Sequence, residues 1–188
     1  MRVTPVTICK FSLIPEAPEH KTVIESLLDE AFGLWRLAKT SYRLREGERP
    51  IEGLSHVAIE ARRGIVGCIS FWRIHIGDDG PPTLLLGPLA VAGDRRGVGI
   101  GRALMNNGID RARSMGYALV ILVGDEPYYG RVGFRKVPED QLILPGPVDP
   151  DRLLFLELEE GAMRKARGLV LPPHRFANRR LSGLHETT

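Results

Sequence analysis

Three alternating glycines, Gly97, Gly99 and Gly101, are the residues whose type and spacing point most directly to chemistry. They stand between an apolar run that reads as a strand, 83–91, and a segment that reads as a helix, 102–115. The first N–H groups of a helix have no partner within the helix, and the helix dipole adds partial positive charge there. Glycine also lets the backbone approach a ligand without a Cβ in the way. The stretch therefore predicts a site for a phosphate or pyrophosphate group.

The glycine spacing separates several kinds of phosphate loop. The dinucleotide fingerprint G-x-G-x-x-G is followed by an acidic residue about 20 positions later. Here the third glycine comes one position early, although Asp125 does follow the next strand-like run. The Walker pattern needs a lysine after its last glycine, and none follows here. Dinucleotide binding and a turn without a ligand stay open at this point. A turn without a ligand is less favoured, because ordering three glycines costs much conformational entropy.

Three blocks of sequence, in order, carry a resemblance to a known family. They read Gly-Pro-Leu-Ala-Val at 87–91, Arg-x-x-Gly-x-Gly at 96–101 and Gly-Asp-x-x-Tyr-Tyr-x-Arg-x-Gly-Phe at 124–134. The second block is similar to the Gln/Arg-x-x-Gly-x-Gly/Ala loop that binds the pyrophosphate of acetyl-coenzyme A (acetyl-CoA) in the GNAT family of N-acetyltransferases. The chain most resembles the YhbS-type branch of that family. The match is dense over 83–137 and looser over 3–76.

The resemblance implies a mixed α/β fold of the α+β type. In the GNAT acyltransferase fold, helices flank a strongly twisted, mostly antiparallel sheet whose fourth and fifth strands are parallel and splay apart. The order of elements agrees with it. Apolar and β-branched runs predict strands at 3–11, 56–60, 65–76, 83–91, 118–123, 134–137 and 153–158. The periodicity predicts helices at 19–31 and 102–115 and allows a further one at 32–44.

Pro88 falls inside a strand, 83–91, that should be central. Proline cannot donate a hydrogen bond and avoids central strands except at bulges. In the family the fourth strand bulges away from the fifth, and the pantetheine arm of the cofactor fills the gap. The resemblance thus implies that Leu89, Ala90 and Val91 offer main-chain groups to the cofactor. An edge strand with a harmless proline is the alternative.

The resemblance assigns the other cofactor contacts to the glycine loop and its surroundings. The cofactor would be acetyl-CoA, acting as a cosubstrate, and no metal is expected. Besides the three strand residues, the expected contacts are Arg96, Gly97, Val98, Gly99, Ile100, Gly101, Arg102 and Tyr128.

Two side chains are candidates for proton transfer. In the pattern Tyr-x-x-x-Gly-Phe, Tyr129 corresponds to the tyrosine that the family uses near the thioester sulfur. A phenol with a pKa near 10 is protonated at neutral pH, so Tyr129 is the expected general acid for the leaving thiolate. His75, at the end of a strand facing the expected cleft, is a candidate general base because its ordinary pKa is near neutrality. A structural histidine and a water relay are the alternatives.

The resemblance implies an N-acetyltransferase that moves an acetyl group from acetyl-CoA to a primary amine, by direct attack through a tetrahedral intermediate. The amine would belong to a small molecule or a peptide. Trp35, Arg36 and Tyr42 are the expected acceptor contacts, and with Arg43 and Arg45 they favour an acceptor with an aromatic part or a carboxylate. A solvated arginine face is the alternative for this segment. A non-catalytic acyl-CoA sensor is the alternative for the whole protein, since it needs only the glycine loop.

The chain has 188 residues, enough for one domain with a real core. We expect a single acetyltransferase domain over 1–160 and a basic extension over 161–188 that is partly ordered or flexible. The stretch 161–184 has six basic residues and no acidic ones. It could touch RNA or another polyanion, or pack through 169–171 on a second copy of the chain to form a homodimer.

The remaining composition narrows the class of protein. The 26 basic and 23 acidic residues give a net charge of +3, which is too balanced to demand a nucleic acid. The two cysteines, Cys9 and Cys68, lie far apart and favour neither a disulfide framework nor a zinc site. No apolar run approaches the roughly 20 residues that cross a bilayer, and the N-terminus lacks a signal-peptide core. We expect a cytoplasmic protein without a membrane partner.

Overall fold

The computed structural model describes residues 11–177 of the chain. Its strands are β1 (Ser12–Pro15), β2 (His56–Glu60), β3 (Gly64–Ile76), β4 (Thr83–Val91), β5 (Leu119–Val123), β6 (Arg135–Lys136), β7 (Leu142–Ile143), β8 (Leu153–Glu157) and β9 (Gly168–Leu171). Its α-helices are α1 (Lys21–Phe32), α2 (Thr40–Arg43), α3 (Ile100–Ser114), α4 (Glu126–Tyr129) and α5 (Ala162–Lys165). Short 3-10 turns lie at Pro18–His20, Leu34–Ala38, Gly93–Arg95, Gly130–Val132 and Pro150–Arg152.

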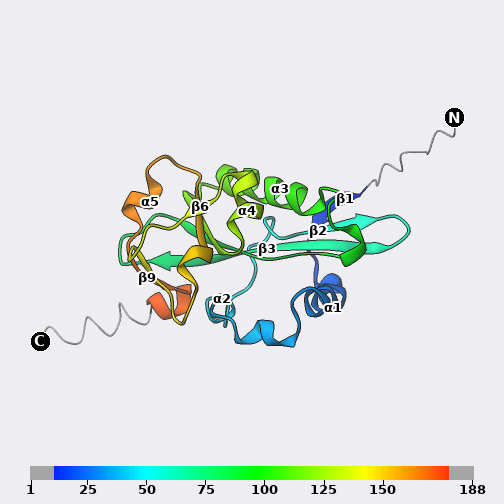
Figure 1. Ribbon diagram of the computed structural model, residues 1–188, viewed down its shortest axis with the longest axis horizontal. Coiled ribbons are helices and arrows are strands. Elements are labelled where there is room, and N and C mark those ends of the chain that lie inside the picture. The colour runs from blue at the N-terminus through cyan, green and yellow to red at the C-terminus, as the bar shows by residue number, and fades with distance from the viewer. Residues whose placement is uncertain (1–10, 178–188) are drawn as a thin grey trace, which may run out of the picture.

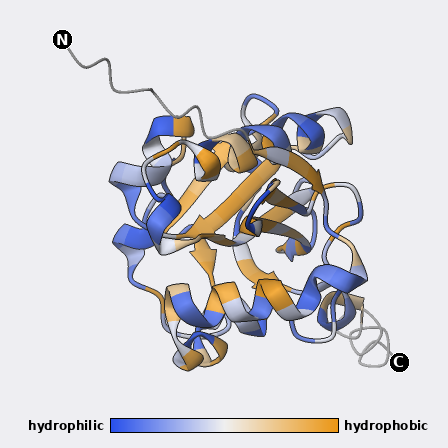
Figure 2. Cartoon of the chain, turned by 90° about the vertical axis from the view of Figure 1, so that its right-hand side faces the viewer, coloured by the Kyte–Doolittle hydropathy of each residue, from blue (hydrophilic) through white to orange (hydrophobic). Residues whose placement is uncertain are grey.

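The strands form one mixed sheet in the order β1-β2-β3-β4-β5-β8-β6, with β9 paired to the end of β3 and to β7. Neighbours along the main path are antiparallel except for the parallel pair β4 and β5. Helices α3 and α4 cover one face, and α1 and α2 cover the other (Figure 1). Colouring by hydropathy shows a mainly hydrophobic sheet between helices with hydrophilic outer surfaces (Figure 2). The mixed, mostly antiparallel sheet expected from the sequence is confirmed.

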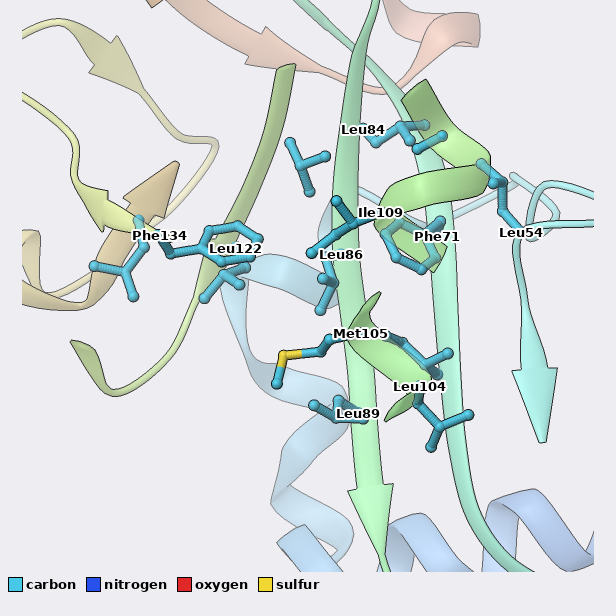
Figure 3. Packing of buried hydrophobic residues seen from close by; sticks show 14 of the residues in the cluster. Leu54, Phe71, Leu84, Leu86, Leu89, Leu104, Met105, Ile109, Leu122 and Phe134 are labelled. Carbon is cyan, nitrogen blue, oxygen red and sulfur yellow. The ribbon is translucent and has the colours of Figure 1, made fainter. Parts of the chain in front are cut away.

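Helix α3 anchors the largest part of the core. Its buried residues Leu104, Met105 and Ile109 pack on the sheet beside Phe71 and other apolar strand residues (Figure 3). Burying each such side chain stabilises the fold by about 1.5–3 kcal/mol. Gly108, in the middle of this helix, lies so close to the ring of Phe71 that a Cβ would overlap it. The packing fixes α3 against the sheet, and with it the position of the glycine loop.

A bulge interrupts β4 near its centre. Ile69 of β3 pairs with Leu89 and Phe71 pairs with Leu86, so Ser70 faces two residues of β4, Gly87 and Pro88. Because side chains alternate along a strand, a regular strand would place Leu86 and Leu89 on opposite faces. The bulge places both in the core under α3. The expectation that Pro88 marks a bulge is confirmed.

The parallel strands β4 and β5 separate beyond this point. Their pairing runs from Thr83 to Leu85 of β4, although β5 extends to Val123. The second half of β4 therefore faces a gap in the sheet instead of a partner strand. The splayed pair expected from the sequence is confirmed.

Several expected elements differ in the structure. The expected strand 3–11 lies almost wholly outside the described residues, Phe11 is not in a strand, and the first described strand is Ser12–Pro15. The helix allowed at 32–44 is wrong as a continuous helix. It divides into the turn Leu34–Ala38 and the single turn α2, because Gly33 (φ 70°) and the extended Lys39 interrupt the helical backbone.

The described part of the expected C-terminal extension has regular structure. It forms α5 and β9, and β9 pairs with His75 and Ile76 of β3 and with β7. These elements of two to four residues carry too little periodicity to be found from sequence. Among the described residues, no helix has the length and apolar character required to cross a membrane.

Candidate functional site

A cavity of about 420 Å³ lies between the open half of β4, the start of α3 and α4. We call it the glycine-loop cavity. The structure brings together here all of the expected cofactor contacts except Val98, whose side chain is 46% exposed. The lining includes Leu89, Ala90, Val91, Arg96, Gly97, Gly99, Ile100, Gly101, Arg102, Tyr128 and Tyr129, with Arg95, Met105, Arg131, Val132 and two residues of α1, Ala31 and Phe32.

The glycines shape the loop at the N-terminus of α3. Gly97 (φ 81°) and Gly99 (φ 93°) adopt left-handed backbone conformations, and Gly99 caps the helix. Nothing lies within 4 Å of a Cβ built on either residue, so the loop is open to a ligand. The first N–H groups of α3 face this opening without helical partners. The space and the donors fit a pyrophosphate.

Two tyrosines of α4 form the opposite wall. The hydroxyl of Tyr128 packs on Gly101, where a Cβ would overlap it. Tyr129 lies edge-on to Tyr128, with ring centroids 5.0 Å apart, and packs against Phe134. Burial raises the pKa of the Tyr129 phenol well above its usual value, and Tyr128 and Asp125 raise it further. The hydroxyl of Tyr129 is therefore a hydrogen-bond donor at neutral pH.

A second cavity of about 1260 Å³ lies on the other face of the sheet. We call it the α1–α2 cavity, because α1, α2 and the chain that follows α2 enclose much of it. Pro88 lines this cavity, whereas the next residue, Leu89, lines the glycine-loop cavity. The two cavities thus reach β4 at consecutive residues, at the bulge.

Sequence reasoning missed a carboxylate in the α1–α2 cavity. Glu16 follows β1, and its Oε2 accepts a hydrogen bond of 3.3 Å from the hydroxyl of Ser70, the residue opposite the bulge. Burial raises the pKa of Glu16, and the Ser70 hydrogen bond opposes this effect. No pattern around Glu16 signals this position, because it depends on the pairing of three strands. A carboxylate with a raised pKa is a stronger base than an ordinary carboxylate.

The expected acceptor residues have different environments. Arg36 is 3% exposed and is held by Glu25, by Asp29 at 2.9 Å and by the hydroxyl of Tyr42 at 2.7 Å. Its hydrogen-bonding groups are therefore engaged within the protein. Tyr42 lines the α1–α2 cavity, whereas Trp35 is 86% exposed and does not line it.

The structure does not bring His75 to either cavity. It lies at the end of β3, paired with Leu171, and its ring stacks on Phe176 with centroids 4.3 Å apart. Burial lowers the pKa of His75, and the charge of Arg73 lowers it further. These contacts join β3 to the C-terminal segment, away from the β4 bulge. Cys68 is buried in the core, and Cys9 lies outside the described residues.

Comparisons of the sequence with known proteins identify a family and two relatives. The model of the acetyltransferase (GNAT) family matches residues 21–134. The uncharacterized N-acetyltransferase YhbS of Escherichia coli K12 is 29% identical over 155 residues, which cover 82% of this chain and 92% of YhbS. The uncharacterized N-acetyltransferase YjhQ of the same strain is 34% identical over 120 residues, which cover 63% of this chain and 66% of YjhQ.

Two solved structures have a similar fold. The crystal structure of E. coli YhbS in complex with CoA has a TM-score of 0.76 and 26% identity, covering 95% of this chain and 97% of YhbS. A GNAT acetyltransferase from Brucella melitensis in complex with acetyl-CoA has a TM-score of 0.58 and 24% identity, covering 82% and 98% of the two chains. The second likeness concerns the fold alone.

Proposed function

The chain belongs to the GNAT family of acetyltransferases, and we propose that it transfers an acetyl group from acetyl-CoA directly to a primary amine through a tetrahedral intermediate. The observation that carries this proposal is that two cavities reach β4 at consecutive residues of one bulge. Pro88 lines the larger cavity and Leu89 lines the smaller one, which the glycine loop borders. A donor and an acceptor can therefore approach β4 from opposite sides.

The glycine-loop cavity would hold the cofactor. The N–H groups at the start of α3 would bind its pyrophosphate, and the open edge of β4 from Leu89 to Val91 would pair with its amide arm. Buried main-chain groups need such partners, because leaving one unsatisfied costs about 1–3 kcal/mol. When bound, acetyl-CoA would supply the acetyl group as a thioester. The YhbS complex with CoA supports this assignment.

Tyr129 and the β4 main chain would stabilise the negative charges that develop on the leaving thiolate and on the carbonyl oxygen. The buried phenol of Tyr129 stays protonated and can donate to the thiolate. A main-chain N–H near Leu89 or Ala90 would donate to the carbonyl oxygen as negative charge develops on it, which is a large contribution to acyl transfer. Both groups line the same cavity.

We propose Glu16 as the group that takes a proton from the acceptor's ammonium, directly or through one water, so that the neutral amine can attack the thioester carbonyl. Its carboxylate lines the α1–α2 cavity with Ser70 and Pro88. The raised pKa favours proton acceptance, and the hydrogen bond from Ser70 holds the carboxylate opposite the bulge. Glu16 takes the role for which the sequence proposed His75, because His75 lines neither cavity.

The acyl-CoA sensor remains the competing function, and it requires only the glycine-loop cavity. The second cavity supports transfer, because its volume of about 1260 Å³ is ample for a small substrate. The deciding experiment incubates the protein with acetyl-CoA and a panel of primary amines. Release of free thiol and an acetylated amine, both reduced in Tyr129→Phe, would support the enzyme. A protein that binds acetyl-CoA but acetylates no amine would favour the sensor.

A further inference from the structure

Arg45 differs from Arg36, the buried arginine that lines the same α1–α2 cavity. Its guanidinium lies over the rings of Tyr42, 4.4 Å from the centroid, and Trp72, at 5.7 Å. Its Nε is buried and has no hydrogen-bond partner. Within residues 11–177 no ion pair joins Arg45 to a carboxylate, whereas Arg36 is paired with Glu25 and Asp29. Arg45 therefore contributes a partly buried cation to the cavity, and no carboxylate of the described residues is paired with it.

The position of Arg45 links it to the place of transfer. A Cβ built on Gly87 would lie 3.4 Å from Nη2 of Arg45, so the guanidinium borders the β4 bulge. The indole Nε1 of Trp72 donates a hydrogen bond of 2.6 Å to the carbonyl of Gly87, which fixes one of the two rings beneath the cation. The positive charge is therefore held next to Pro88, where the two cavities approach each other.

A cation in this setting calls for an anionic partner. Burial lowers the pKa of Arg45 to about 10, yet the group stays charged at neutral pH. Withdrawing an unpaired charge from water is costly even when burial is partial, and a ligand carboxylate would offset that cost. The planar guanidinium of arginine matches a carboxylate through two parallel hydrogen bonds, and stacking on aromatic rings holds its plane in place.

The cavity also offers a negative group for the other end of an acceptor. Glu16, tied to Ser70 opposite the bulge, attracts an ammonium group, and Arg45 attracts a carboxylate. We propose that the acceptor is a small amine that carries a carboxylate, as an amino acid does, and that Arg45 binds this carboxylate. This inference rests on the proposed acetyltransferase function and names its acceptor class. An amine without a nearby anion would leave the cation of Arg45 without a counter-ion.

The test compares acids with their neutral counterparts in the full-length protein. Free amino acids and the corresponding primary amides serve as acceptors, with thiol release and product mass as readouts. We expect the wild type to prefer the acid over its amide by about 10- to 100-fold in kcat/KM, since hydrogen bonds to charged groups are strong. Arg45→Met should abolish this preference, mainly through KM for the acid, and Arg45→Lys should restore part of it.

Arg49→Met is the matched control. Arg49 lines the same cavity but is exposed, so its loss removes an equal charge without removing the guanidinium of Arg45 beside the bulge. We expect this variant to keep the preference for acids. Equal use of acids and amides by the wild type would overturn the inference, and this comparison holds even if Arg45→Met fails to fold. A preference for aminoalkylphosphonates over amino acids would also overturn it, because the anion would then not be a carboxylate.

The acetyl-CoA binding of each variant separates the two proposals. Arg45→Met should keep the wild-type thermal shift with acetyl-CoA, since Arg45 does not line the glycine-loop cavity. If the protein acetylates amines equally well with and without a carboxylate, and Arg45→Met acetylates them as the wild type does, only the proposed acceptor class is contradicted. Failure of the wild type to acetylate any amine would contradict the proposed function itself.

Discussion

The hydroxyl of Ser70 donates a hydrogen bond of 3.3 Å to Oε2 of Glu16, and Ser70 is the residue of β3 that faces the bulge at Gly87 and Pro88. Glu16, which follows β1, is thereby held opposite the bulge in β4. The contact places a partly buried carboxylate in the α1–α2 cavity. It shows how the fold could supply a base although β4 itself contains no acidic residue.

Substituting Glu16→Gln should lower kcat by about 100-fold, the usual size of a general-base contribution. The variant keeps the shape of the side chain and its contact with Ser70, so KM for acetyl-CoA should hardly change. Steady-state kinetics with a saturating acceptor would measure both constants. A variant with wild-type kcat would remove Glu16 from the mechanism.

The pH dependence of kcat provides an independent test of the same group. A base acts when deprotonated, and burial raises the pKa of Glu16, so activity should fall as the pH drops through that raised value. Ser70→Ala removes a hydrogen bond that lowers this pKa, so the acidic limb should move to higher pH. Glu16→Gln should lose the limb. An identical limb in the wild type and both variants would assign it to another group.

Tyr129→Phe should reduce kcat by about 100-fold and leave the affinity for acetyl-CoA nearly unchanged. The ring would keep its packing on Phe134, and the variant would lose only the proton donated to the thiolate. Tyr128→Phe is the matched substitution, because its hydroxyl packs on Gly101 at the glycine loop. Direct binding and turnover measurements on both variants separate the roles. Equal turnover in Tyr129→Phe and the wild type would refute the assignment.

Gly108→Ala should destabilise the protein by about 1–3 kcal/mol, the usual cost of overpacking. Alanine favours a helix over glycine by about 1 kcal/mol, but a Cβ at this position overlaps the ring of Phe71. Asn106→Ala, at an exposed site of the same helix, should be neutral or slightly stabilising. Urea unfolding of the two variants checks the prediction. A stabilised Gly108→Ala protein would show that the packing between α3 and Phe71 is loose enough to admit a methyl group.

The sequence predicted much of the sheet, and it grouped most of the residues that line the glycine-loop cavity. Local signals were sufficient for β2 and β4, whose bounds match the expected ranges. The bulge followed from Pro88 together with the family resemblance, since a central strand tolerates proline mainly at a bulge. The glycine loop was also readable, because its spacing and its place between strand and helix are local features. These residues lie close together in the sequence, so their spatial grouping required little tertiary information.

The acceptor side could not be predicted in the same way. Glu16 and Ser70 are 54 positions apart, and they meet only because β1 pairs with β2 and β2 with β3. Likewise, Arg36 and Arg45 look alike in the sequence, yet only Arg36 is paired with carboxylates among the described residues. His75 appeared suitable because of its ordinary pKa, but the pairing of β3 with β9 places it elsewhere.

Thermal unfolding with and without acetyl-CoA tests the central claim most directly, on the wild type, Gly99→Glu and Gly99→Ala. Both substitutions strain the left-handed backbone at Gly99 (φ 93°), but only glutamate places a negative charge at the mouth of α3. At about 100 times its Kd, acetyl-CoA should stabilise the wild type by roughly 2.7 kcal/mol. We predict that Gly99→Ala keeps a clear shift and that Gly99→Glu loses it. No shift in the wild type, or an equal shift in all three proteins, would contradict acetyl-CoA binding at the glycine loop.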